Sequence, residues 1–191
     1  GNIFDSKTIL LNISNFLMFS RTLGEESFDE EGHSIIQLED SSFIILGRID
    51  DDILLTKTNR YGELDWQQSI GGSQEDIANH IYSTIDGGYV ISGETESYGN
   101  GGKDIWLIKT NQSGLMDWNV CLGTNNNDQA GQAIQTQDGG FILVGGKAQN
   151  SNNNTNVWLI KTNSQGDTTW TQSFGGSESD SGTDILVEEN E

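Results

Sequence analysis

The chain has 191 residues, of which 24 are glycine and none is proline, and it carries a formal net charge of −20 at pH 7. The negative field of such a chain repels nucleic acid and anionic membrane surfaces, so neither is an expected partner. No run of 18 apolar residues occurs, which argues against insertion into a membrane as a helix. The glycine content fits many short strands joined by turns that need a positive φ.

A repeat of about 52 residues organises the sequence. Trp66, Trp118 and Trp170 lie 52 residues apart. The same spacing relates the lysines of three Lys-Thr-Asn triplets, Lys57, Lys109 and Lys161. It also relates two sets of turn glycines, which are Gly62, Gly114 and Gly166 in one set and Gly88 and Gly140 in the other. So many matched positions predict a repeat architecture.

Taken in chain order, the predicted elements begin and end with incomplete units. They are two strands at residues 8–15 and 17–23, three fuller units at about 32–70, 78–122 and 130–174, and a last strand at 181–189. The first and last pieces align with different strands of the same unit. Together they would supply one divided unit.

Each full unit is expected to form four short strands. In the second unit the strands are predicted near residues 78–84, 89–93, 104–110 and 117–122. A turn at Asp86-Gly87-Gly88 supplies the glycines that a tight hairpin needs, and residues 94–103 form a polar loop. Alternation in the third strand sends Ile105 and Leu107 to one face of the sheet and Trp106 and Ile108 to the other.

The motif Asp-Gly-Gly-Tyr…Gly…Asp-x-Trp-Leu-Ile-Lys-Thr-Asn…Gly…Trp covers nearly the whole chain. It resembles the kelch-like β-propeller repeats of secreted and cell-surface bacterial and archaeal proteins. The resemblance implies an all-β propeller of four-stranded antiparallel blades in one domain, residues 1–191. Its three repeats would span about 25–72, 73–124 and 125–176, with a blade split between residues 1–24 and 177–191.

The divided blade leaves four arrangements open. The chain could close a four-bladed ring with its own ends, or two chains could share blades in an eight-bladed ring. Head-to-tail completion would give a filament, because a heterologous contact that does not close propagates. The chain could also be part of a longer propeller.

Nothing in the sequence indicates an enzyme. The only histidines, His33 and His80, are interpreted as occupying the same place in their units, near the start of the first strand, and Cys121 takes the place of Ser69 and Ser173. No glycine pair is followed by the Lys-Ser/Thr end of a phosphate loop. These residues are interpreted as structural.

Calcium is the only cofactor that the sequence suggests. Asp76, Asp128 and Asp180 recur at 52-residue spacing in loops rich in oxygen-bearing side chains, which suit a hard cation. The competing interpretation is that each aspartate caps its own turn by accepting backbone N–H groups. The spacing also lacks the twelve-residue calcium-loop pattern.

The function expected from these features is that of an extracellular or cell-surface structural or adhesive module. Self-assembly by strand exchange of the terminal segments would make a second copy its partner, and a surface glycan or protein is the other expected partner. Exposed tryptophans would instead suit a carbohydrate-binding propeller, and calcium would suit a stabilised surface domain. Asn12, Asn111 and Asn153 match the N-glycosylation acceptor pattern.

Overall fold

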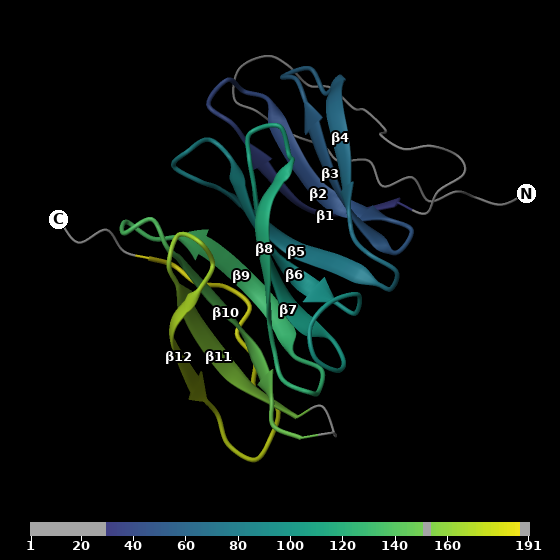
Figure 1. Ribbon diagram of the computed structural model, residues 1–191. Coiled ribbons are helices and arrows are strands. Elements are labelled where there is room, and N and C mark those ends of the chain that lie inside the picture. Colours follow the sequence, from purple (N-terminus) through teal and green to yellow (C-terminus); the bar gives the residue numbers. More distant parts are fainter. Residues whose placement is uncertain (1–29, 151–153, 188–191) are drawn as a thin grey trace, which may run out of the picture.

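A computed structural model describes residues 30–150 and 154–187, which form twelve strands and no helix (Figure 1). The predicted all-β class is confirmed. The strands are β1 (Glu30–Gln37), β2 (Phe43–Ile49), β3 (Asp52–Thr58), β4 (Leu64–Ile70), β5 (Asp76–Ser83), β6 (Tyr89–Thr95), β7 (Asp104–Thr110), β8 (Met116–Leu122), β9 (Gln129–Gln135), β10 (Phe141–Ala148), β11 (Thr155–Thr162) and β12 (Thr168–Phe174). With strands alone, this part of the chain offers no helix that would cross a membrane.

The strands form three antiparallel sheets of four, each made of consecutive strands. We call them the first sheet (β1–β4), the second sheet (β5–β8) and the third sheet (β9–β12). They follow one another along the chain without closing into a ring among the described residues (Figure 1). The predicted four-stranded unit is therefore confirmed, whereas a propeller arrangement is not.

Consecutive sheets pack through the first strand of the later sheet. Strand β5 contacts β1, β2 and β3, and strand β9 contacts β5, β6 and β7. We call the interface of the first and second sheets the first junction, and that of the second and third sheets the second junction.

Side-chain alternation on β7 feeds both junctions, as the sequence predicts. Trp106 and Ile108 belong to the apolar cluster of the first junction, with Ile44 and Leu55 of the first sheet among its members. Ile105 and Leu107 belong to the cluster of the second junction. The central strands of the second sheet are consequently buried on both faces.

The turn between the first two strands keeps one conformation in all three sheets. Gly87 and Gly139 adopt φ values of 81° and 80°, and Ser41 adopts 69° at the same position. In each turn an aspartate three residues before the second strand accepts the backbone N–H of the residue two positions later, namely Asp40 from Ser42, Asp86 from Gly88 and Asp138 from Gly140. The first turn therefore keeps the same conformation and the same aspartate bond with serine at the left-handed position, where an L side chain is less favourable than glycine.

Candidate functional site

The recurrent lysines hold these turns against their sheets. The Lys109 side chain is 6% exposed, and its ammonium lies 3.0 Å from an Asp86 carboxylate oxygen and donates to the Thr110 carbonyl at 2.8 Å. Lys161 makes the same pair of contacts with Asp138 and the Thr162 carbonyl. The glycines Gly88 and Gly140 leave room for the lysines, since a Cβ there would lie 2.5 Å from the ammonium nitrogen. The lysine, the aspartate and the glycine thus stabilise the turn against its sheet.

Hydrogen bonding lowers the pKa of the turn aspartates. The Thr84 hydroxyl, followed by Lys109 and the Gly88 amide, lowers the pKa of Asp86 to about 2. The Thr136 hydroxyl, followed by Lys161, lowers the pKa of Asp138 well below its ordinary 3.8. Both carboxylates are thereby kept ionised and paired.

The calcium candidates lie at successive sheet boundaries, where each closes its own loop. Asp76 and Asp128 are buried and begin or directly precede a first strand. Each aspartate accepts the amide N–H of the residue four positions earlier, which is Gly72 for Asp76 at 2.7 Å, Thr124 for Asp128 at 2.6 Å and Gly176 for Asp180 at 3.2 Å. The backbone of each also donates across the boundary at 2.7 Å, from Asp76 to Asp51, from Asp128 to Lys103 and from Asp180 to Thr155.

These contacts are those of a capping residue. No group of three histidine, cysteine or acidic side chains in the described ranges has the arrangement of a metal site. One oxygen of Asp76, Oδ1, has no hydrogen-bond partner although it is buried. Calcium binding stays a prediction.

The tryptophans of the fourth strands each face the following sheet. A Cβ on Gly114 would lie 2.6 Å from the Trp66 ring, and one on Gly166 would lie 2.8 Å from the Trp118 ring. Each ring therefore packs on the glycine turn between the third and fourth strands of the next sheet, where glycine is required by both space and a positive φ. Trp170 occupies the same position on the last described sheet and is 47% exposed.

Residues 175–187, which we call the tail, run along the outer face of the third sheet without forming a regular strand (Figure 1). The Gly182 amide donates to the Gly145 carbonyl at 3.1 Å, and the Gln132 amide donates to the Thr183 carbonyl at 2.9 Å. Gly182 packs against Val144, where an added Cβ would lie 2.2 Å from a methyl group. The tail thus covers part of the third sheet at the place where β5 and β9 cover theirs.

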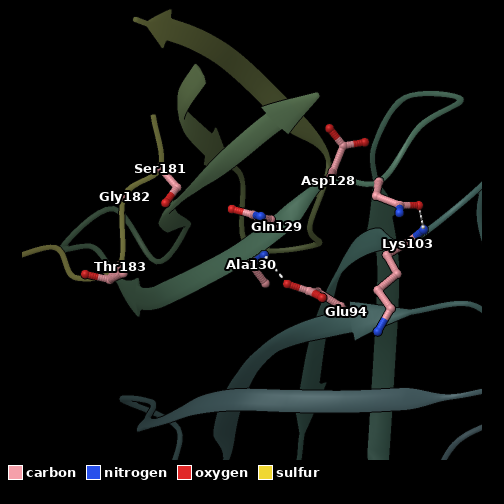
Figure 2. A pocket seen from close by; sticks show the side chains of 9 residues that line it. Glu94, Lys103, Asp128, Gln129, Ala130, Ser181, Gly182 and Thr183 are labelled. Carbon is pink, nitrogen blue, oxygen red and sulfur yellow. Dashed lines mark hydrogen bonds between the residues drawn. The ribbon is translucent and has the colours of Figure 1, made fainter. Parts of the chain in front are cut away.

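A cavity of about 310 Å³ opens at the second junction, between the second sheet, β9 and the tail (Figure 2). Its lining residues are Glu94, Lys103, Asn127, Asp128, Gln129, Ala130, Ser181, Gly182 and Thr183. Figure 2 shows the tail residues on one side, and Glu94 and Lys103 on the other. The lining is mostly polar, so the cavity suits a polar ligand.

The charged groups of the cavity come from β6 and from the loops that directly precede β7 and β9. The Glu94 Oε1 atom accepts the Ala130 amide at 3.1 Å, and burial raises the pKa of this carboxyl. The Lys103 ammonium lies 2.6 Å from Glu75, which raises the pKa of Lys103 and lowers that of Glu75. Both carboxylate oxygens of Asp128 accept backbone amides.

Glu94 was expected in a loop, but the structure places it in β6, so this expectation is wrong. Glu94 pairs with Ile77 on one side and Ile105 on the other, and these ladders extend β6 to Thr95. A polar side chain in an apolar strand gives no strand signal. The strand register places Arg48, Glu94 and Gly146 at the same position of their units. The change of charge at this position is visible only from that comparison.

The histidines and the cysteine take structural positions. His33 is the bulge residue of β1 and corresponds to Asn79 rather than to His80, so the predicted equivalence of the two histidines is wrong. Both strands carry a bulge at the same register position, and His80 is the residue after it. His33 Nδ1 contacts the Ala78 carbonyl at 2.7 Å across the first junction. Burial, followed by the Asp104 and Asp76 charges, raises the pKa of the Cys121 thiol to about 11, which disfavours a nucleophilic thiolate.

The glycosylation candidates fall in different parts of the chain. The Asn111 side-chain oxygen accepts the Ser113 amide at 2.9 Å and so helps to form the turn before β8. Asn12 and Asn153 lie outside the described residues.

Comparison with protein families finds no model that matches the chain, and comparison with curated proteins finds no significant match. The structure itself therefore supplies the argument about function.

Proposed function

We propose that this protein is a β-propeller-type module with a structural or adhesive function outside the cell or on its surface. In this proposal it has no enzymatic activity and associates with a second copy of itself. The contact surface is the outer face of the third sheet, which the tail covers in part. One observation carries the proposal: the tail repeats the contacts with which β5 and β9 begin their sheets, so a fourth unit is started there.

Three repeated contacts support this reading of the tail. The boundary aspartate donates to the preceding sheet at 2.7 Å at Asp180, as at Asp76 and Asp128. The same aspartate accepts the amide four residues earlier. A small residue then follows two positions later against the bulge of the preceding first strand, and these residues are Ala78 beside His33, Ala130 beside Asn79 and Gly182 beside Gly131.

Exposed aromatic groups on β12 support a further contact. Trp170 and Phe174 on β12 are 47% and 51% exposed, whereas Trp66 and Trp118 are half-buried against the next sheet. Exposed aromatic residues at the centre of a contact surface are typical of interfaces. The complementary surface, a glycine turn of the same repeat, is one that a second copy carries.

Strand exchange through residues 1–24 remains a prediction, because these residues lie outside the described part. The net charge of −20 makes two copies repel each other at low ionic strength. Added salt screens that repulsion, so it should strengthen the association.

Sedimentation equilibrium over a range of protein concentrations tests the proposal. We expect a mass that rises above the monomer with concentration, and more steeply in added salt. A chain that ends at residue 175 and the Trp170→Ala variant should both shift toward the monomer. A full-length chain that stays monomeric at every concentration and salt level would contradict self-association.

Carbohydrate binding is the second candidate, and Trp170 is the observation that favours it. Trp106 and Trp158 are buried at 1% and 7% exposure, so they cannot stack on a sugar ring from solvent. A glycan array read with the full chain and with Trp170→Ala tests this candidate. Binding that Trp170→Ala abolishes would support it, and silence of the array would contradict it.

A further inference from the structure

The two junctions differ in charge at one position of the repeat. At the first junction Arg48 lies on the second strand of the first sheet, and its guanidinium is 3.3 Å from Glu75, which directly precedes β5. At the second junction the corresponding residues are Glu94 and Asn127. The cation and anion of the first junction are thus replaced by an anion and a neutral amide.

This replacement coincides with the cavity at the second junction. Glu94, Asn127 and the tail all line it. Within the described chain, Glu94 Oε1 accepts one amide, and Oε2 makes no hydrogen bond. Glu94 forms no ion pair at contact distance within the described chain, and a half-buried ionised carboxylate in that state is costly, so a positive group in the cavity would be stabilised.

Lys103 does not fill that need by itself. Its ammonium contacts Glu75 at 2.6 Å and Glu96 at 3.8 Å, so Lys103 serves other carboxylates besides its weaker attraction to Glu94. The charged groups that face this region are Glu75, Glu94, Glu96 and Asp128 against Lys103 and Arg48. The surroundings therefore carry excess negative charge.

We propose that the cavity at the second junction binds the cationic end of a small organic ligand, a guanidinium or primary ammonium group, with the Glu94 carboxylate as its counter-ion. The ligand supplies the positive charge that Arg48 supplies at the first junction. Asn127 and Gln129 contribute polar groups to its surroundings, and residues Ser181 to Thr183 form one wall. The volume of about 310 Å³ lies at the small end of ligand sites. This site is separate from the surface around Trp170, so it does not depend on self-association.

Methylguanidinium tests the proposal, with methylurea as a neutral probe of the same shape. Two-dimensional amide NMR of the full chain at pH 8 should show saturable shifts for Lys103, Ala130 and Gly182 with methylguanidinium and none with methylurea. Glu94→Gln should weaken binding at least tenfold. Glu96→Gln, a matched change to an exposed carboxylate near the same lysine, should leave binding within twofold.

A titration of the unchanged protein keeps the proposal testable if Glu94→Gln unfolds. Binding of methylguanidinium should weaken as the pH falls and Glu94 takes up a proton. The proposal is overturned if methylguanidinium gives no saturable shift, if methylurea binds equally, or if Glu94→Gln binds as well as the parent. Shifts at these amides with Ca²⁺ and none with methylguanidinium would also overturn it and assign the cavity to a metal ion.

Discussion

The same positions of the repeat form contacts at the two junctions and on the outer face of the third sheet. All of these contacts form at the junctions, but only some of them form on the outer face. At each junction a fourth-strand tryptophan and a bulge residue of the earlier sheet contact the later sheet, and a buried aspartate of the later sheet contacts the earlier one. On the outer face of the third sheet, the tail residues Asp180 and Gly182 make the equivalent contacts, but Trp170 stays exposed. If the tail begins a fourth unit as proposed, it docks without the strands that would follow it, and the described residues contain no turn that would cover Trp170.

The boundary aspartates recur because of their backbone contacts, and a shared metal site is not needed to explain their spacing. The boundary aspartates keep their backbone contacts in all three places, so the repeat preserves them for folding. Residues that change between units, such as Arg48 and Glu94, are the ones that make the junctions different. The proposed cation site therefore depends on a position that varies between units and not on one that recurs.

The largest expected effect is the difference in stability between the Asp128→Ala and Asp180→Ala variants. Asp128→Ala leaves the Thr124 and Ala148 amides without their acceptor inside the second junction. Loss of two hydrogen bonds to a charged group should lower the free energy of unfolding by about 3 kcal/mol or more. Asp180→Ala removes one 3.2 Å bond on the tail and should cost less than about 1 kcal/mol. Urea denaturation of both variants measures the difference, and equal losses would contradict the comparison.

The tryptophans give the next effect. Trp118→Ala removes a ring that packs on Gly166 and lies edge-on to the Phe141 ring, with the ring centroids 5.5 Å apart, so we expect a loss of about 2–3 kcal/mol in stability. Trp170→Ala should cost below about 1 kcal/mol, since surface substitutions are nearly neutral. Thermal unfolding of dilute protein compares the two. A larger loss for Trp170→Ala would mean that its ring is already covered.

Glycine substitutions separate backbone strain from packing. Gly114 and Gly87 have similar φ values, 73° and 81°, but only Gly114 faces a neighbour, the Trp66 ring. Gly87→Ala should cost about 1–2 kcal/mol for its left-handed backbone. Gly114→Ala carries the same strain plus the displacement of Trp66, so its loss should be clearly larger. Equal losses in chemical denaturation would show that the ring moves freely.

The smallest expected effect is the change that Asp86 causes in the free energy of unfolding at acid pH. Because the folded pKa of Asp86 is about 2 and its ordinary value is 3.8, its contribution is complete above about pH 4 and is lost as the pH falls toward 2. Asp86 is largely exposed, so the contribution should stay below about 1 kcal/mol. Asp86→Asn should flatten the unfolding free energy between pH 4 and pH 2. An unchanged acid slope would contradict the pairing with Thr84 and Lys109.

The sequence predicts the unit well because the same turn and strand signals recur three times. The third strand of the second unit was predicted at residues 104–110, which are the bounds of β7, and Ser41 takes the positive φ expected of a glycine. The start of β5 at Asp76 was placed two residues too late. Its first residue is a buried aspartate held by backbone bonds, which apolar periodicity does not reveal.

The candidate site was less accessible to sequence reasoning. The cavity depends on a tail from the end of the chain, a carboxylate in β6 and the loop before β9, which lie far apart in the sequence. The recurrent residues singled out from the sequence are instead those that repeat a fold contact. Only the register of the strands brings Arg48 and Glu94 to one position.

Hydrogen exchange of individual amides tests most directly the claim that the tail begins a fourth unit. The Asp180 and Gly182 amides should be protected, and the Gln132 amide should lose protection in a chain that ends at residue 175. The Asp128 amide, which donates to Lys103, should remain protected in both chains. Exchange of Asp180 and Gly182 at the rate of an unfolded chain, with Gln132 unaffected by the truncation, would contradict the account.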